Sequence, residues 1–139
     1  MGNLVLVIED SKTVSKVIEV GLGREGYEVV CCDSGERALH WLASPSTNTI
    51  PDLILVDLVL PEMDGYSVIR ILRSRSVLAH IPIVIISRRN GFIDTLRGKL
   101  VGANAHLVKP LEMTNLLAVV GEYIGTPTLV LSAVSPVVP

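Results

Sequence analysis

Short apolar segments of strand length alternate with segments of helical periodicity five times along the chain. The apolar segments are Leu4–Ile8, Glu28–Cys32, Asp52–Val56, Pro82–Ile86 and Ala105–Val108. Apolar residues at helical spacing follow each of them, as Val14, Ile18 and Leu22 follow the first. This regular alternation predicts an open parallel α/β sheet with helices on both faces.

The composition fits such a sheet with an aliphatic core. Hydrophobic residues make up 49% of the 139 residues and aromatic residues only 4%, which favours strands rich in Val, Leu and Ile under a cover of helices. We expect one domain over residues 1–125 and an apolar, proline-containing tail over residues 126–139. That tail is either a linker stub leading to an output module, or an added strand or arm that packs on its own domain or a partner.

The charge and the cysteines indicate a soluble, cytoplasmic protein. A net charge of −2 gives no electrostatic support to direct nucleic-acid binding by this domain. No apolar run approaches the ~18 residues of a membrane span, and no secretory leader is expected. The adjacent Cys31 and Cys32 cannot join distant elements, so we expect them to be reduced strand residues.

Polar residues gather at the carboxyl ends of the expected strands, where open α/β sheets carry their functional crevice. They are Glu9 and Asp10 after the first strand, Asp57 after the third, Ser87 after the fourth, and Lys109 with Pro110 after the fifth. Three carboxylates that converge repel one another unless a cation is present, and Mg²⁺ binds carboxylate, water and phosphate oxygens. With a hydroxyl and an ammonium group opposite, the pattern predicts that Asp57 is a nucleophile that accepts a phosphoryl group.

Four blocks of the sequence resemble those of response-regulator receiver domains of the chemotaxis type, which act in two-component signalling. The blocks are LVLVIEDS (4–11), DLVLPEMDG (57–65), PIVIIS (82–87) and GANAHLVKPL (102–111). The resemblance covers residues 4–124 and implies a flavodoxin-like fold with five parallel strands in the order 2-1-3-4-5. It further implies that a sensor histidine kinase or phosphotransfer protein donates the phosphoryl group. Output would then pass through protein contacts to an unknown partner, or through a possible homodimer.

The resemblance also implies which residues hold the metal ion. Asp10 and Asp57 would bind Mg²⁺ directly, Glu9 through a water molecule, and Val59 through its carbonyl group. The apolar Val59 side chain cannot hydrogen-bond a hydrolytic water, so we expect the phosphoryl group on Asp57 to be long-lived.

The same family pattern assigns the switch residues. Ser87 would be the switch hydroxyl, Lys109 the ammonium that contacts the phosphoryl group, and Lys109–Pro110 a cis peptide bond. Three positions depart from the pattern, one of them Leu111, where the family often has Phe. His106 stands where an aromatic switch residue is usual, and Arg88 replaces a small residue after the switch hydroxyl and is expected to lie across the phosphoryl group.

Three other functions remain as alternatives. A degenerate receiver would act by protein contact without phosphorylation. A haloacid-dehalogenase-like phosphatase would need a second acid two residues after the nucleophile, where this chain has Val59. An FMN-binding flavodoxin would need a phosphate-cradling loop after the first strand, where the chain has two acids.

Several residues also have purely structural interpretations. Asp10 or Ser11 is expected to cap the first helix, and His106 is expected on an exposed strand face rather than at a metal. The stretch GLGREG (21–26) matches a dinucleotide-binding pattern but follows a helix, so its glycines are expected to end that helix. A solvated helix face is expected to carry Arg70, Arg73 and Arg75.

Overall fold

The computed structural model describes residues 2–44, 49–88 and 92–127 as a three-layer α/β domain. Its elements are β1 (Leu4–Ile8), α1 (Lys12–Arg24), β2 (Glu28–Cys32), α2 (Gly35–Ala43), β3 (Leu53–Asp57), α3 (Gly65–Ser74), the 3-10 helix η1 (Ser76–Leu78), β4 (Ile83–Ser87), α4 (Phe92–Val101), β5 (Ala105–Val108) and α5 (Met113–Ile124). The five strands are parallel and lie in the order β2-β1-β3-β4-β5, which confirms the predicted fold. Of the expected tail over residues 126–139, only Thr126 and Pro127 belong to the described residues.

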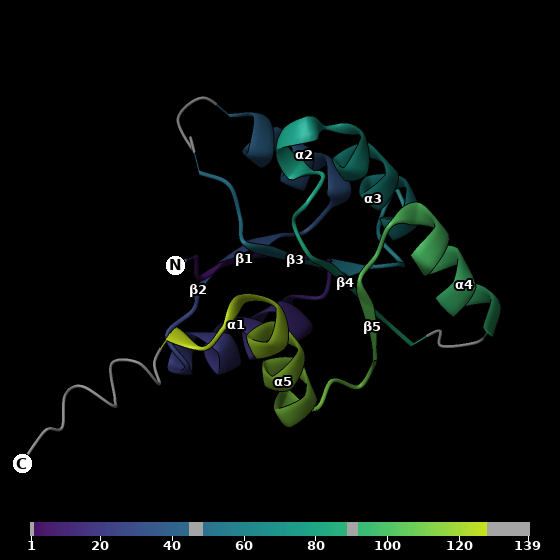
Figure 1. Ribbon diagram of the computed structural model, residues 1–139. Coiled ribbons are helices and arrows are strands. Elements are labelled where there is room, and N and C mark those ends of the chain that lie inside the picture. The colour runs from purple at the N-terminus through teal and green to yellow at the C-terminus, as the bar shows by residue number, and fades with distance from the viewer. Residues whose placement is uncertain (1, 45–48, 89–91, 128–139) are drawn as a thin grey trace, which may run out of the picture.

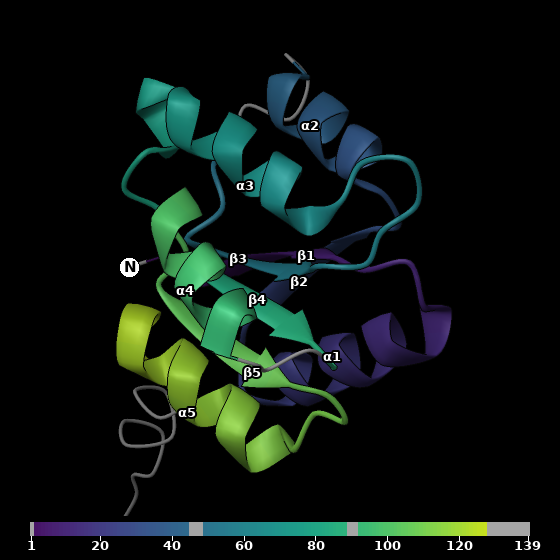
Figure 2. The same ribbon diagram turned by 90° about the vertical axis from the view of Figure 1, so that its right-hand side faces the viewer.

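The three central strands are buried throughout, and apolar except for the last residues of β3 and β4, because both faces of the sheet are covered. Helices α1 and α5 lie on one face, and α2, α3 and α4 lie on the other (Figures 1 and 2). Successive side chains of a strand point to opposite faces. Leu6 and Ile8 therefore pack with the α2–α3 layer, whereas Val5 and Val7 pack with the α1–α5 layer. No helix in the described ranges is both long enough and apolar enough to cross a membrane.

Side-chain caps fix where the helices begin. The Ser11 hydroxyl accepts the Val14 N–H at 3.2 Å, so Ser11 and not Asp10 caps α1. The Asp64 carboxylate caps α3 in the same manner, through the Ser67 N–H. Because capping falls to Ser11, the carboxylate of Asp10 is left to the acidic site at the end of β1.

Strand boundaries differ from the predicted ones by one residue. β3 and β4 each begin and end one residue later than expected, so Asp57 and Ser87 are the last residues of these strands instead of the first loop residues. The hydrogen bonds of the sheet therefore position both residues directly. The short η1 helix was not predicted.

The prediction for the glycines of residues 21–26 was wrong in part. Helix α1 continues through Gly21 and Gly23 to Arg24, and only Gly26 turns the chain, with φ of 93°. A Cβ at Gly21 would overlap the Met113 side chain, so this glycine allows α1 and α5 to approach closely. The nucleotide-binding pattern finds no support, because these glycines lie in and after a helix.

The prediction of a solvated Arg73 was also wrong. Its guanidinium is half-buried at the end of the sheet opposite the acidic residues and donates hydrogen bonds to four backbone carbonyls, those of Leu78, Ala79, Ile81 and Gly102. A further bond reaches Asn104 Oδ1 at 2.9 Å. Arg73 therefore connects the chain segments that follow α3 and α4.

Candidate functional site

Three carboxylates meet at the carboxyl ends of two neighbouring strands. Glu9 and Asp10 follow β1, and Asp57 ends β3, which pairs with β1 through Ile8 and Val56. Carboxylate oxygens of the three residues lie within 4.8 Å of one another. Glu9 and Asp57 are buried, whereas Asp10 is exposed. The predicted acidic cluster is therefore present and opens to solvent on the Asp10 side.

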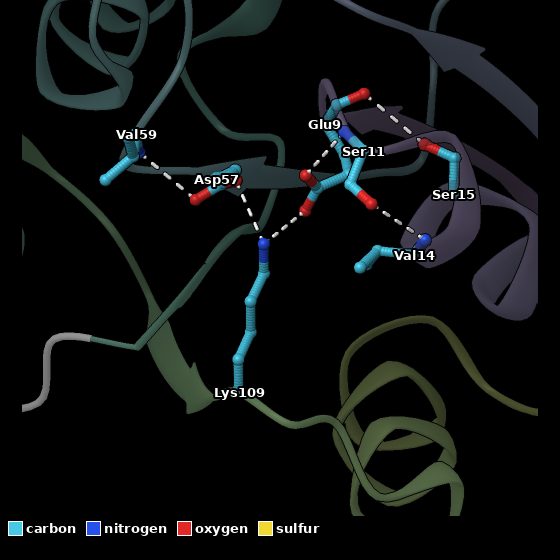
Figure 3. Close-up of polar contacts among 7 residues, drawn as sticks. All are labelled: Glu9, Ser11, Val14, Ser15, Asp57, Val59 and Lys109. Atoms are coloured by element: carbon cyan, nitrogen blue, oxygen red, sulfur yellow. Dashed lines mark hydrogen bonds and ion pairs between the residues drawn. The ribbon is translucent and has the colours of Figure 1, made fainter.

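The Lys109 ammonium group bridges two of these acids. Its Nζ lies 3.0 Å from Asp57 Oδ2 and 2.7 Å from Glu9 Oε1, and its side chain is only 14% exposed (Figure 3). Burial alone would lower the pKa of Lys109, but the contacts with Glu9 and Asp57 outweigh burial and raise this pKa. The Lys109 side chain therefore stays protonated. The peptide bond that joins Lys109 to Pro110 is cis, as predicted.

Glu9 is held by two further backbone contacts. Its Oε2 accepts the Ser11 N–H at 3.0 Å, and its carbonyl accepts the Ser15 hydroxyl at 3.3 Å (Figure 3). Burial raises the pKa of Glu9, the bonds from Lys109 and Ser11 lower it in part, and the nearby Asp57 charge raises it further. The net shift of the Glu9 pKa is upward, with burial as its main cause.

The ends of β4 and β5 bring Ser87 and Lys109 side by side. Ser87 is buried, pairs with Val108 in the sheet, and its carbonyl accepts the Lys109 N–H at 2.9 Å. Because Asp57 pairs with Ile86 on the neighbouring strand, the Ser87 hydroxyl belongs to the same end of the sheet as the acids. The structure thus gathers the predicted hydroxyl, ammonium and carboxylate groups.

Val59 contacts the phosphoacceptor candidate through its backbone. Its N–H donates to Asp57 Oδ1 at 3.1 Å, and its side chain is 62% exposed (Figure 3). The N–H fixes one carboxylate oxygen of Asp57 while Lys109 fixes the other. Arg88, which follows Ser87, is exposed at the same end of the sheet.

His106 lies away from this cluster, and the prediction of an exposed strand face was wrong. It is half-buried on β5, pairs with Ile85, and lines a small pocket of about 70 Å³ together with Thr95, Gly98 and Lys99 of α4. The pattern did not reveal this because α4 covers β5 from a distant part of the sequence.

The sequence also gave no warning of two features beside Asp57. One is the direct Glu9–Lys109 ion pair. The other is the requirement for glycine at position 65, where a Cβ would lie against Asp57 O and 2.8 Å from Leu58 Cα. Gly65 was expected to end the loop before a helix over Tyr66–Arg75, whereas it is the first residue of α3.

The donor set fits a hard divalent cation. All three acids offer oxygen, no described sulfur or imidazole ligand belongs to the cluster, and the exposed Asp10 leaves room for water ligands. This is the chemistry that Mg²⁺ prefers. An open groove of about 1220 Å³ leads from Glu9 and Asp10 along the end of β2 to Trp41 of α2, so the acids are accessible from solvent.

Comparison with known proteins places this site in a family. The family model described as "Response regulator receiver domain" matches residues 5–121. Protein PilG of Pseudomonas aeruginosa is 31% identical over 123 residues, which cover 88% of each chain. A probable transcriptional regulatory protein of Picosynechococcus is 37% identical over 117 residues, 82% of this chain and 46% of that protein.

A solved structure of a receiver domain agrees in fold. The receiver domain of the sensor histidine kinase PA1611 from Pseudomonas aeruginosa superposes with a TM-score of 0.77 at 28% identity, covering 91% of this chain and all of that one. A magnesium ion is coordinated in the active-site cleft of that protein. Receiver domains are signalling modules rather than enzymes. With a family match over most of its length and the acidic pocket in place, the chain belongs to the response-regulator receiver domain family.

Proposed function

We propose that the domain is a phosphorylation switch in the cytoplasm, which takes a phosphoryl group onto Asp57 from a sensor histidine kinase or a phosphotransfer protein. The observation that carries this proposal is the Lys109 ammonium bonded to Asp57 at the centre of three converging carboxylates. The phosphorylated domain, over residues 1–125, would then change its contacts with an output protein or with a second copy. Nothing in its net charge of −2 favours nucleic acid as the direct partner.

The transfer is a nucleophilic displacement at phosphorus. An Asp57 carboxylate oxygen forms a bond to phosphorus while the bond from phosphorus to the donor imidazole nitrogen breaks. The electron pair of that bond stays on the imidazole, which then takes up a proton from solvent. The product is an acyl phosphate on Asp57.

Mg²⁺ would be held by Asp10 and Asp57 directly, by Glu9 through water and by the Val59 carbonyl. When bound, the ion supplies positive charge that offsets the negative charge of the transferring phosphoryl oxygens. This proposal is supported by the oxygen donor set of the cluster and by the magnesium ion in the PA1611 receiver. Lys109 would move from its bond with Asp57 to a phosphoryl oxygen, a short change of partner for an ammonium already beside the acceptor.

Ser87 is proposed to bond the phosphoryl group from the end of β4, and its shift would carry the chain before α4 with it. His106 faces the same helix, so we propose that it senses where α4 lies instead of touching the phosphoryl group. Two of the alternative functions, the phosphatase and the degenerate receiver, fit the site less well. A phosphatase of the haloacid-dehalogenase type lacks its second acid at Val59, and a degenerate receiver would not need the intact cluster with its lysine.

The test is the intact mass of the protein after incubation with acetyl phosphate. With Mg²⁺ we expect one added phosphoryl group on the wild type, none on Asp57→Asn, and none when the metal is chelated. Asp33→Asn, which alters an exposed acid outside the cluster, is the matched control and should behave as the wild type. One phosphoryl group retained on Asp57→Asn would overturn the assignment.

The lifetime of the phosphoryl group tests the two modulating positions. Val59 and Arg88 are both exposed at this end of the sheet. The Val59 side chain cannot hydrogen-bond a hydrolytic water, and Arg88 is proposed to lie across the phosphoryl group and cover the path of attack. We expect Val59→Asn and Arg88→Ala to lose the phosphoryl group several-fold faster than the wild type, measured as the decay of the added mass. Unchanged decay in both variants would show that these side chains do not shield the site.

A further inference from the structure

Helix α4 is fastened to α3 by one aromatic residue that the receiver chemistry does not use. Tyr66, at the start of α3, is buried, and its hydroxyl donates toward Asp94, with the Oδ1 atom at 3.1 Å and the backbone carbonyl at 3.3 Å. The Arg97 guanidinium, one turn further along α4, lies 4.2 Å from the centroid of the Tyr66 ring. Asp94 thus binds the hydroxyl group of Tyr66, and Arg97 packs on the face of its ring. Figure 2 shows α3 and α4 side by side.

The α3 side of this contact is fixed to the phosphoacceptor. The Gly65 N–H donates to the Leu58 carbonyl at 3.0 Å, and Gly65 packs so closely on the Asp57 backbone that a Cβ would not fit. Tyr66 follows immediately, so its ring is placed by the same backbone that carries the Asp57 carboxylate. Arg97 also acts on this end of α3. The pKa of Asp64, the α3 cap, is lowered first by the Ser67 N–H and further by the Arg97 and Arg70 charges.

The α4 side of the contact is connected to Ser87. Residues 88–91 link Ser87 to the first residue of α4, and Asp94 lies in the first turn of that helix. A displacement of Ser87 toward a phosphoryl group on Asp57 would pull the start of α4, while Tyr66 stays with Asp57. The displacement would therefore strain the Tyr66–Asp94 bond from its α4 end while its α3 end stays in place.

We propose that Tyr66, Asp94 and Arg97 form a latch that holds α4 in its unphosphorylated position and so opposes phosphorylation of Asp57. The inference rests on the proposed function, because the latch can oppose phosphorylation only if Asp57 accepts a phosphoryl group. By linkage, a contact made only in the unphosphorylated state reduces the apparent affinity for anything that favours the other state. Release of the latch must therefore strengthen binding of a phosphoryl mimic.

Two measurements test the latch with three variants. Tyr66→Phe removes only the hydroxyl, and Arg97→Ala removes the group over the ring while leaving the buried phenol intact. Tyr123→Phe is the matched control, because its hydroxyl bonds the Asn104 carbonyl on the α5 side, away from α4's first turn. The first measurement is amide hydrogen exchange over residues 94–101 without any phosphoryl group. The second is the midpoint for binding beryllofluoride, a phosphoryl mimic, in the presence of Mg²⁺, followed by fluorine NMR.

The latch predicts the same direction in both measurements. Loss of one such bond should speed exchange in α4 roughly two- to tenfold in Tyr66→Phe, lower the beryllofluoride midpoint by a similar factor, and shift both less in Arg97→Ala. Tyr123→Phe should leave both unchanged. Unaltered exchange in Tyr66→Phe and Arg97→Ala would overturn the latch, and faster exchange with an unshifted midpoint would overturn its coupling to the site. Failure of the wild type itself to bind beryllofluoride would instead refute the proposed function, and the coupling with it.

Discussion

Replacement of Arg73 by alanine should destabilise the domain more than any other change to an arginine of α3. The guanidinium donates through Nε to Gly102 O at 2.9 Å and through Nη1 to Ile81 O at 2.8 Å, with the Leu78 and Ala79 carbonyls at 3.2 and 3.1 Å. These carbonyls lie at the end of η1 or in the turns that follow η1 and α4. The Leu78 carbonyl also accepts the Ile81 N–H at 3.3 Å, so it would keep one partner without Arg73. Burial lowers the pKa of Arg73, but the group remains charged at any pH used for folding studies.

The magnitude follows from the number of acceptors that alanine would leave behind. A hydrogen bond from a charged donor is worth roughly 1.5–3 kcal/mol, and a buried acceptor left alone costs about 1–3 kcal/mol. The side chain of Arg73 is half-buried, so water can replace some of these bonds. We therefore expect a total loss of about 3–4 kcal/mol in the free energy of unfolding. At roughly 4 °C per kcal/mol for a domain of this size, the Tm should fall by about 12–16 °C.

Chemical denaturation followed by circular dichroism measures this loss. Arg73→Lys keeps the charge but not the forked geometry, so it should lose about half as much as Arg73→Ala. Arg70→Ala is the matched control, since Arg70 is exposed on the same helix and its removal should change stability by no more than about 0.5 kcal/mol. If Arg73→Ala and Arg70→Ala unfolded at the same denaturant concentration, the reasoning from these carbonyl contacts would be wrong.

Three further predictions concern other parts of the molecule. Gly65→Ala should destabilise the loop at Asp57 and lower the Tm, because the new Cβ meets backbone atoms, whereas Gly23→Ala, with nothing within 4 Å, should stabilise α1 by about 0.5–1 kcal/mol. Mg²⁺ should raise the Tm of the wild type in thermal melts, and much less in Asp10→Asn. Burial raises the pKa of Cys32 to about 11, so its alkylation rate should reach half its maximum near that pH. The Cys32 contribution to stability is retained below pH 9.0 and lost between 9.0 and about 11. The first prediction would be contradicted by an unchanged Tm in Gly65→Ala, and the second by an equal effect of Mg²⁺ on the wild type and Asp10→Asn. An alkylation midpoint near pH 9.0 would contradict the third.

The sequence was sufficient to predict the sheet and the position of its polar ends. In a parallel sheet the carboxyl ends of all strands share one edge, so Glu9, Asp57 and Lys109 are forced together once the strands are recognised. Local signals narrowed the cap of α1 to Asp10 or Ser11, because such a residue acts through its own backbone neighbours, but the Asp64 cap of α3 was not predicted.

Contacts between helices could not be predicted in the same way. The pattern of α3 gives Arg73 and Arg70 the same exposed appearance, yet only Arg73 lies at the helix end that meets the turn before β4 and the turn before β5. Tyr66 reads as an ordinary first-turn residue until α4 is placed beside it, and His106 reads as exposed until the same helix covers β5. Each error arose from the packing of α3 or α4, which depends on the rotation and tilt of helices rather than on periodicity.

The two ends of the sheet surround a buried cation with different groups. The cation at one end serves stability, and the cation at the other end serves the proposed function. Arg73 is one cation surrounded by neutral carbonyls, so its hydrogen bonds are satisfied without an opposing charge and nothing competes for it. Lys109 is one cation beside three carboxylates, so a single positive charge faces three acids. An arrangement with fewer positive than negative charges gains stability from any added cation, and Lys109 can then leave Asp57 at little cost. The excess of negative charge at this end is therefore what makes the site ready to exchange one partner of Asp57 for another.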